Sequence, residues 1–84
     1  MIVKMTKTSS NENKRVDGIV RDGVLGYISH EPRIGEGVTL FYADEARKDS
    51  LIFYTTPVKR IAYEEGSWTI NTQNSTYLIQ EVRD

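Results

Sequence analysis

Short β-forming runs separated by tight turn signals recur along this chain, and they constrain the fold more than any other feature. The last third shows the pattern most clearly, with runs over 58–63, 67–72 and 76–82 separated by Glu-Glu-Gly and Gln-Asn-Ser. Runs of about four to eight β-branched, aromatic and aliphatic residues, ended by turn residues, are typical of strands. No stretch repeats apolar residues at a 3.6-residue spacing over three turns, so we expect no packed helices.

The first two thirds of the chain continue the pattern. We predict strands over 2–5, 16–20, 24–29, 38–42 and 51–55 from their apolar and β-branched residues. Asp22-Gly23 between two such runs favours a hairpin that joins 16–20 to 24–29. The only helix-friendly stretch is 43–50, which predicts at most one short helical turn near 44–49 with Asp44 as its N-cap.

These elements predict an all-β fold: a small, strongly bent antiparallel sheet or barrel, SH3-like or OB-like, with about five to seven short strands. We expect 1–14 to form a basic N-terminal strand or flexible arm, and 15–84 to form a single small β-barrel domain. The predicted core consists of Val16, Ile19, Val24, Leu25, Ile28, Val38, Leu40, Leu51, Phe53, Val58, Ile61, Ile70, Leu78 and Val82.

Length and composition limit the classes of protein to which the chain can belong. Its 84 residues suffice for one domain with a small core. It has no cysteine, which rules out disulfides and thiolate metal sites. The N-terminus lacks the apolar segment of a signal peptide, and no apolar run approaches the roughly 20 residues of a membrane span. We therefore expect a cytoplasmic protein without membrane contact.

Patterns that carry catalysis are absent from the sequence. His30 is the only histidine, so it lacks the companion ligands that a metal site needs. The adjacent acids Glu64 and Glu65 lie at a predicted turn, where both point to water. No glycine-rich phosphate loop occurs. We predict a protein that is not an enzyme and that binds neither metal nor cofactor.

Aromatic residues supply the best candidate binding surface, because tyrosine and tryptophan suit half-buried contact positions. For Trp68 two interpretations stay open: a plug in the core, or the anchor of a contact site. The leading prediction is an interaction module that binds, and regulates or inhibits, a protein partner through exposed aromatics or an edge strand. That edge strand, 51–55, suits pairing with a partner's strand or with another copy. The candidate contact residues are Tyr54, Lys59, Tyr63, Trp68, Asn74 and Tyr77.

Two other functions remain open. The formal net charge is -1, but basic residues are concentrated near the N-terminus. This distribution supports an alternative function, a small barrel that binds single-stranded nucleic acid by phosphate contacts and by base stacking on Tyr or Trp. The basic residues for that role are Lys4, Lys7, Arg15, Arg21 and Lys59. A structural component of a larger assembly is the third interpretation.

Overall fold

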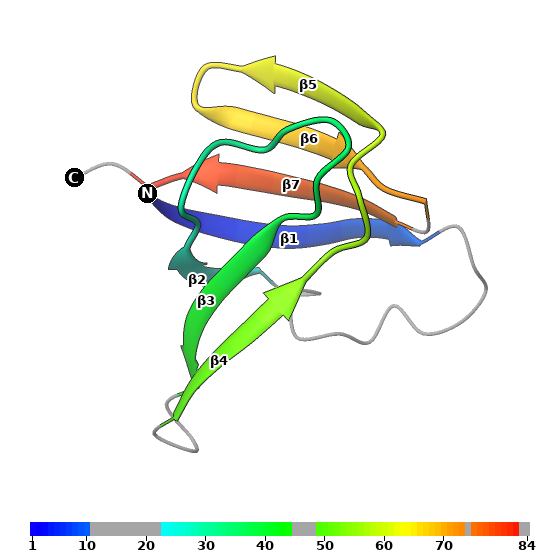
Figure 1. The fold of residues 1–84 in the computed structure, drawn as a ribbon. Coiled ribbons are helices and arrows are strands. Elements are labelled where there is room, and N and C mark those ends of the chain that lie inside the picture. Colours follow the sequence, from blue (N-terminus) through cyan, green and yellow to red (C-terminus); the bar gives the residue numbers. More distant parts are fainter. Residues whose placement is uncertain (11–22, 45–48, 74, 83–84) are drawn as a thin grey trace.

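A single antiparallel sheet of seven strands forms the fold (Figure 1). The computed structural model describes residues 1–10, 23–44, 49–73 and 75–82. Within these ranges there is no helix, and the predicted all-β class is confirmed. The strands are β1 (Ile2–Ser10), β2 (Val24–Tyr27), β3 (Thr39–Asp44), β4 (Asp49–Tyr54), β5 (Arg60–Glu64), β6 (Ser67–Asn71) and β7 (Ser75–Glu81).

The strand order is β4-β3-β2-β1-β7-β6-β5, which places the first strand of the chain in the middle of the sheet. β1 pairs with β2 on one side and with the last strand, β7, on the other. The register of β1 against β7 shifts between Lys7 and Ser9, where a bulge increases the local twist. The two ends of the described chain therefore lie together (Figure 1).

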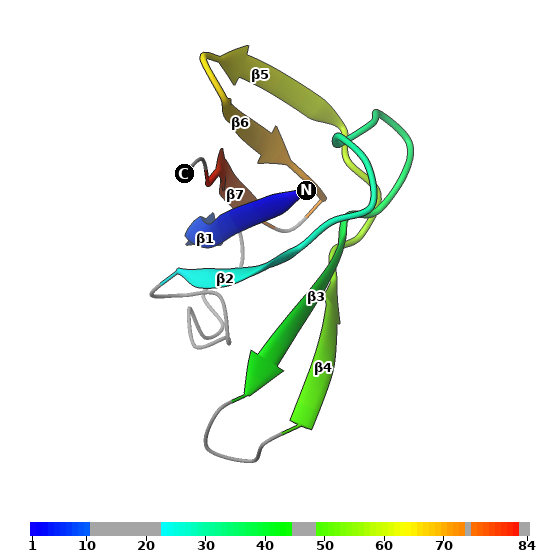
Figure 2. The same ribbon diagram turned by 90° about the vertical axis from the view of Figure 1, so that its left-hand side faces the viewer.

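The sheet is curled rather than closed (Figure 2). The segments 29–38 and 55–59 cross its concave side and are joined by a parallel bridge between Ile34 and Val58. Gly35 N donates to Val58 O at 2.8 Å, and Val58 N donates to Glu36 O at 3.0 Å. Among the described residues β4 and β5 are the two edges of the sheet and do not pair. The antiparallel sheet is thus present as predicted, without the closure of a barrel.

The core lies on the concave side, because alternate residues of each strand point there. In β1 these are Val3 and Met5, and in β6 they are Trp68 and Ile70. Val24, Leu51, Phe53 and Ile61 are partly buried against this cluster. The buried hydrophobic residues are Val3, Met5, Ile28, Val38, Leu40, Tyr42, Val58, Trp68, Ile70, Tyr77 and Ile79.

Three predicted core residues, Leu25, Leu78 and Val82, lie outside the core. Leu25 is 62% exposed and Val82 is 41% exposed. In β2 the inward positions belong to Val24 and Gly26, so Leu25 between them points outward. Leu78 is half-buried on the side of its strand opposite the buried Ile79. Val16 and Ile19 lie outside the described residues.

Two predicted elements fall wholly or mainly outside the described ranges. The strand 16–20 cannot be compared, but β2, its predicted hairpin partner, pairs with β1 and β3. The predicted helical turn near 44–49 falls mainly on residues 45–48, which lie outside the described ranges; of its two ends, Asp44 is the last residue of β3 and pairs with Asp49, the first residue of β4.

Candidate functional site

Large apolar side chains are concentrated on the convex side of the sheet over β1 to β4, where the exposed Lys4 also lies, opposite Leu25. They are linked through the strand register, in which Ile2 lies opposite Tyr27, Tyr27 opposite Phe41, and Phe41 opposite Ile52. Paired residues point to the same side, as do residues two apart on one strand. These side chains, 43–70% exposed, form what we call the apolar face: Ile2, Leu25, Tyr27, Phe41, Ile52 and Tyr54.

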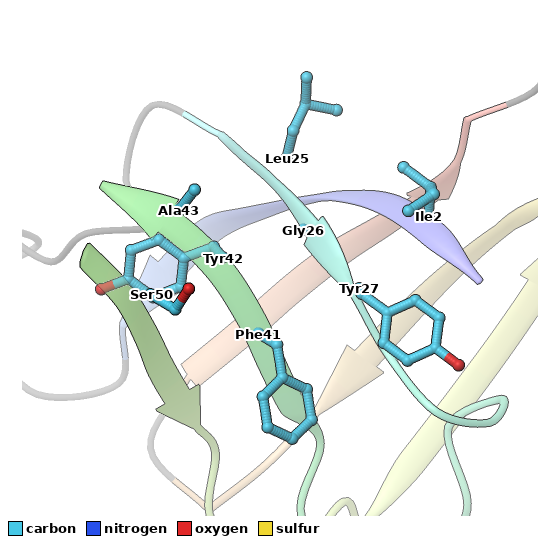
Figure 3. A pocket seen from close by; sticks show the side chains of 8 residues that line it. All are labelled: Ile2, Leu25, Gly26, Tyr27, Phe41, Tyr42, Ala43 and Ser50. Carbon is cyan, nitrogen blue, oxygen red and sulfur yellow. The ribbon is translucent and has the colours of Figure 1, made fainter. Parts of the chain in front are cut away.

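A shallow depression of about 370 Å³ lies within the apolar face, where β2 meets β3 (Figure 3). Leu25 and Tyr27 border it from β2, and Phe41 borders it from β3. Gly26 also borders the depression, and β3 lies close to β2 there, since a Cβ on Gly26 would lie 2.6 Å from Phe41 O. The remaining lining residues are Ile2, Tyr42, Ala43 and Ser50. The lining is largely apolar and carries no charged side chain, so it suits hydrophobic contact rather than proton transfer.

The other half of the convex side, over β5 to β7, is more polar, and its apolar side chains are the small Ala62 and the half-buried Leu78. Thr69 of β6 is exposed there and lies opposite Leu78 on one side and Ala62 on the other. Arg60 and Glu64 of β5 point to the same side, two residues before and after Ala62. The convex side is therefore divided into an apolar half and a polar half. An apolar patch bordered by polar surface is typical of an interaction site.

Two predicted contact residues lie in the core. Trp68 is 4% exposed and Tyr77 is 6% exposed, which agrees with the core interpretation of Trp68. The Tyr63 ring packs on Trp68 at a centroid distance of 5.2 Å, and Gly66 N donates to Tyr63 Oη at 3.1 Å. Tyr63 remains exposed at the edge of the sheet, but the structure does not join it to Trp68 and Tyr77 in one accessible surface.

Tyr77 is buried in the core, where its ring packs against another aromatic ring. Phe53 from the other half of the sheet packs edge-on against its ring at 6.0 Å. Burial raises the pKa of Tyr77, and a side-chain hydrogen bond with Ser75 opposes that shift. A phenol held protonated inside the core stabilises packing and offers no group to a partner.

The other predicted contact and basic residues are dispersed. Tyr54 is the most exposed residue of the apolar face, and Lys59 is exposed just before β5. Lys4 and Lys7 lie on opposite sides of β1 by strand alternation, so the sheet does not align them along one groove. Asn74, Arg15 and Arg21 lie outside the described residues.

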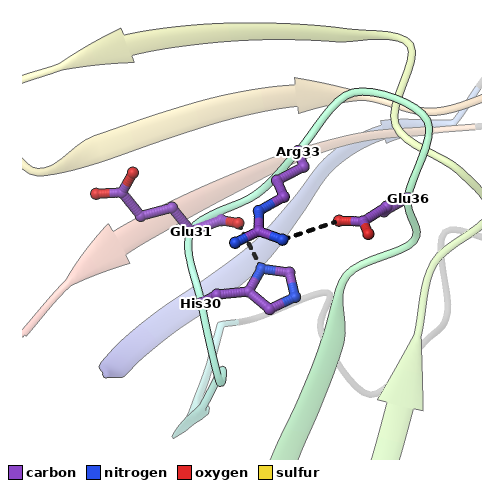
Figure 4. A network of polar contacts seen from close by, with 4 residues as sticks. All are labelled: His30, Glu31, Arg33 and Glu36. Atoms are coloured by element: carbon purple, nitrogen blue, oxygen red, sulfur yellow. Dashed lines mark hydrogen bonds and ion pairs between the residues drawn. The ribbon is translucent and has the colours of Figure 1, made fainter.

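The loop between β2 and β3 holds a small polar network (Figure 4). His30 Nδ1 lies 2.8 Å from Glu31 O, and Arg33 Nη1 lies 3.9 Å from Glu36 Oε2. All these side chains are exposed, where such pairs contribute little. Within the described ranges no group of three or more His, Asp or Glu side chains is placed to hold a metal ion. Nor does that part of the chain contain a helix of the length and apolarity that a membrane span requires.

Sequence reasoning missed most of the apolar face. Only Tyr54 was named as a contact residue, whereas Leu25 was assigned to the core. A signal was present: the run 51–54, Leu-Ile-Phe-Tyr, is apolar on both sides of a strand, and 40–42, Leu-Phe-Tyr, is similar. Only one side of a strand can face the core of a single sheet, so each such run leaves apolar residues on the convex side.

Comparison with protein-family models, with curated proteins and with solved structures found no match to this chain.

Proposed function

We propose that this chain is a non-enzymatic interaction module that binds a protein partner through its apolar face. The observation that supports the proposal is the continuity of that face across four neighbouring strands. With about 200 Å² for a fully exposed large side chain, its residues expose roughly 650 Å² together. That slightly exceeds the largest patch on a typical monomer, about 300–600 Å², and approaches one side of a standard interface, about 800 Å².

The chemistry of the face indicates the kind of partner. Aromatic and aliphatic side chains surround a shallow depression that has room for a projecting apolar side chain. Such a partner would present a hydrophobic anchor to the depression and polar groups to the rim. By covering a surface of its partner, the module would regulate or inhibit that partner. The curled sheet with its covering segments also supports a relation to small SH3-like or OB-like modules as part of this proposal.

Affinity capture with matched variants tests the proposal. Leu25→Glu places a carboxylate at an exposed position of the apolar face, and Thr69→Glu places the same group on the polar half of the same side. We expect the tagged wild-type chain and Thr69→Glu to retain the same partner from cell extract, and Leu25→Glu to lose it. Circular dichroism checks that both variants are folded. Equal retention by the two folded variants would exclude the apolar face as the binding surface.

A further inference from the structure

The two edges of the sheet differ in their protection against pairing with another strand. β5 begins with Arg60 and ends with Glu64, and charged side chains discourage pairing at a free edge. β4 (Asp49–Tyr54) has a charge only at its first residue, Asp49, and its residues 50–54, Ser-Leu-Ile-Phe-Tyr, carry neither a charge nor a proline. β4, which is an edge of the sheet (Figure 1), is therefore the less protected of the two edges.

The hydrogen-bond pattern identifies the backbone groups that this edge offers. Thr55 N donates to Val38 O at 3.0 Å, and Val38 N donates to the side-chain Oγ1 of Thr55 at 3.0 Å, so the backbone N–H of each of these residues points toward the other. Antiparallel pairs alternate along a ladder, and the register joins Tyr54 to Thr39 and Ile52 to Phe41. Tyr54, Ile52 and Ser50 therefore direct their N–H and C=O groups away from β3.

A strand added to this edge must be apolar on both sides. On the convex side it would lie beside Ile52 and Tyr54, which are 54% and 70% exposed. On the concave side it would lie beside Leu51 and Phe53, which are only partly buried. A strand with charges at either set of positions would bury them next to apolar side chains without a partner. The residues 51–54 meet this requirement themselves, Ser50 adds no charge, and so no charge within 50–54 opposes their pairing with an identical strand.

We infer that the occupant of this edge is a second copy of the chain, with the two β4 strands antiparallel about a two-fold axis at Ile52. The inference rests on the proposed function in that Ile52 and Tyr54 belong to the apolar face. In this register Ile52 lies opposite Ile52 of the second copy, and Ser50 lies opposite Tyr54. These are the positions whose backbone groups point outward, so each opposed pair exchanges two hydrogen bonds. The two apolar faces then form one continuous surface.

Five residues per copy bury less than the roughly 800 Å² per partner of a standard interface. The dimer should consequently dissociate on dilution, and sedimentation velocity over a range of concentrations should follow the equilibrium. Ile52→Lys places two ammonium groups opposite each other at the axis and should weaken the dimer by about tenfold or more. Thr69→Lys, which adds the same charge on β6, should dimerise as the wild type does.

A cysteine at the axis tests the register itself, since the chain has no other cysteine. Opposed residues in a hydrogen-bonded pair have Cα atoms about 5.5 Å apart, which is within the disulfide range of about 4.4–6.8 Å. Under mild oxidation Ile52→Cys should form a covalent dimer at least about ten times faster than Thr69→Cys, as seen on a non-reducing gel. Because the gel detects a covalent product of a different variant, it tests the pairing of the two β4 strands even if Ile52→Lys fails to fold.

Equal rates for the two cysteine variants, or a wild-type chain that stays monomeric at every concentration, would overturn the inference. The edge would then be free for a strand of another protein. If Leu25→Glu loses the partner but Ile52→Cys forms no crosslink, the proposed function is supported and the dimer is rejected. If Ile52→Cys crosslinks but Leu25→Glu still captures the partner, the dimer is supported and the proposed function is rejected.

Discussion

Gly26 allows β2 and β3 to lie close together beside the candidate site. A Cβ at this position would lie 2.6 Å from Phe41 O and 2.7 Å from Leu40 Cδ1. Backbone atoms cannot yield as the end of a flexible side chain can, so β3 approaches β2 this closely only because residue 26 has no side chain. β2 and β3 share one register pair, Tyr27 with Phe41, and the depression opens beside it.

Gly26→Ala should therefore destabilise the fold. We expect the free energy of unfolding to fall by roughly 1–3 kcal/mol, the usual cost of forcing atoms into a packed site, despite the entropic advantage of alanine in a strand. Urea denaturation followed by circular dichroism measures it. Ala62→Val adds volume at an exposed position of β5 and should change stability by no more than about 0.5 kcal/mol. A Gly26→Ala midpoint equal to that of the wild type would show that β3 can move away from β2.

At the scale of the element, the β5–β6 hairpin contains a residue in an unfavourable conformation. Its two-residue turn has φ angles of 36° at Glu65 and 81° at Gly66. Positive φ at both central positions indicates a type I′ turn, which matches the right-handed twist of the strands and favours Asn-Gly. Glycine meets this requirement at residue 66, whereas glutamate at residue 65 adopts the left-handed region at a cost.

Glu65→Asn should stabilise the protein by about 0.5–1 kcal/mol, because asparagine tolerates the left-handed region better than glutamate. For a domain of this size that gain corresponds to a melting temperature higher by a few degrees. Glu64→Asn removes the same charge from the neighbouring residue, which lies in the extended strand, and should not raise the melting temperature. An equal increase in both variants would attribute the gain to charge rather than to the turn.

The sequence predicted where β6 and β7 begin better than it predicted which side of each strand faces the core. The turn residues Glu-Glu-Gly predicted the first residue of β6, and Gln-Asn-Ser predicted the start of β7 to within one residue, because such residues between apolar runs favour turns. The side of each strand that faces the core was harder to predict. In 24–28 and 51–54 apolar residues occupy both sides, so alternation gives no preference. Leu25 was misassigned for this reason, and Phe41 and Ile52 were missed as members of the apolar face.

The whole molecule depends on pairing between its two ends. β7 lies between β1 and β6 and contributes Tyr77 and Ile79 to the core. Met5 and Ile79 are directly opposed in the register, and both are fully buried. The sequence predicts strands over 2–5 and 76–82 but contains no local signal that they pair, because no turn connects them. Pairing across the length of the chain costs loop-closure entropy, which slows folding in proteins of this kind.

A chain cut before β7 should consequently lose its fold. Residues 1–72 would lack Tyr77 and Ile79, whose burial contributes about 1.5–3 kcal/mol each, against the few kcal/mol expected for a domain of this size. The cut would also leave the facing edges of β1 and β6 without a partner. We expect 1–72 to show the circular dichroism of an unfolded chain, and a synthetic peptide of residues 73–84 to restore the sheet when added.

The peptide carrying Ile79→Lys serves as the control, because it would place a charge at a fully buried position opposite Met5. It should restore no sheet signal at concentrations at which the natural peptide does. If residues 1–72 alone showed a cooperative thermal transition, β1 to β6 would fold without β7, and the prediction would be wrong. Recovery of the sheet with the natural peptide alone would instead establish that the β1–β7 contact holds the two halves of the sheet in one cooperative unit.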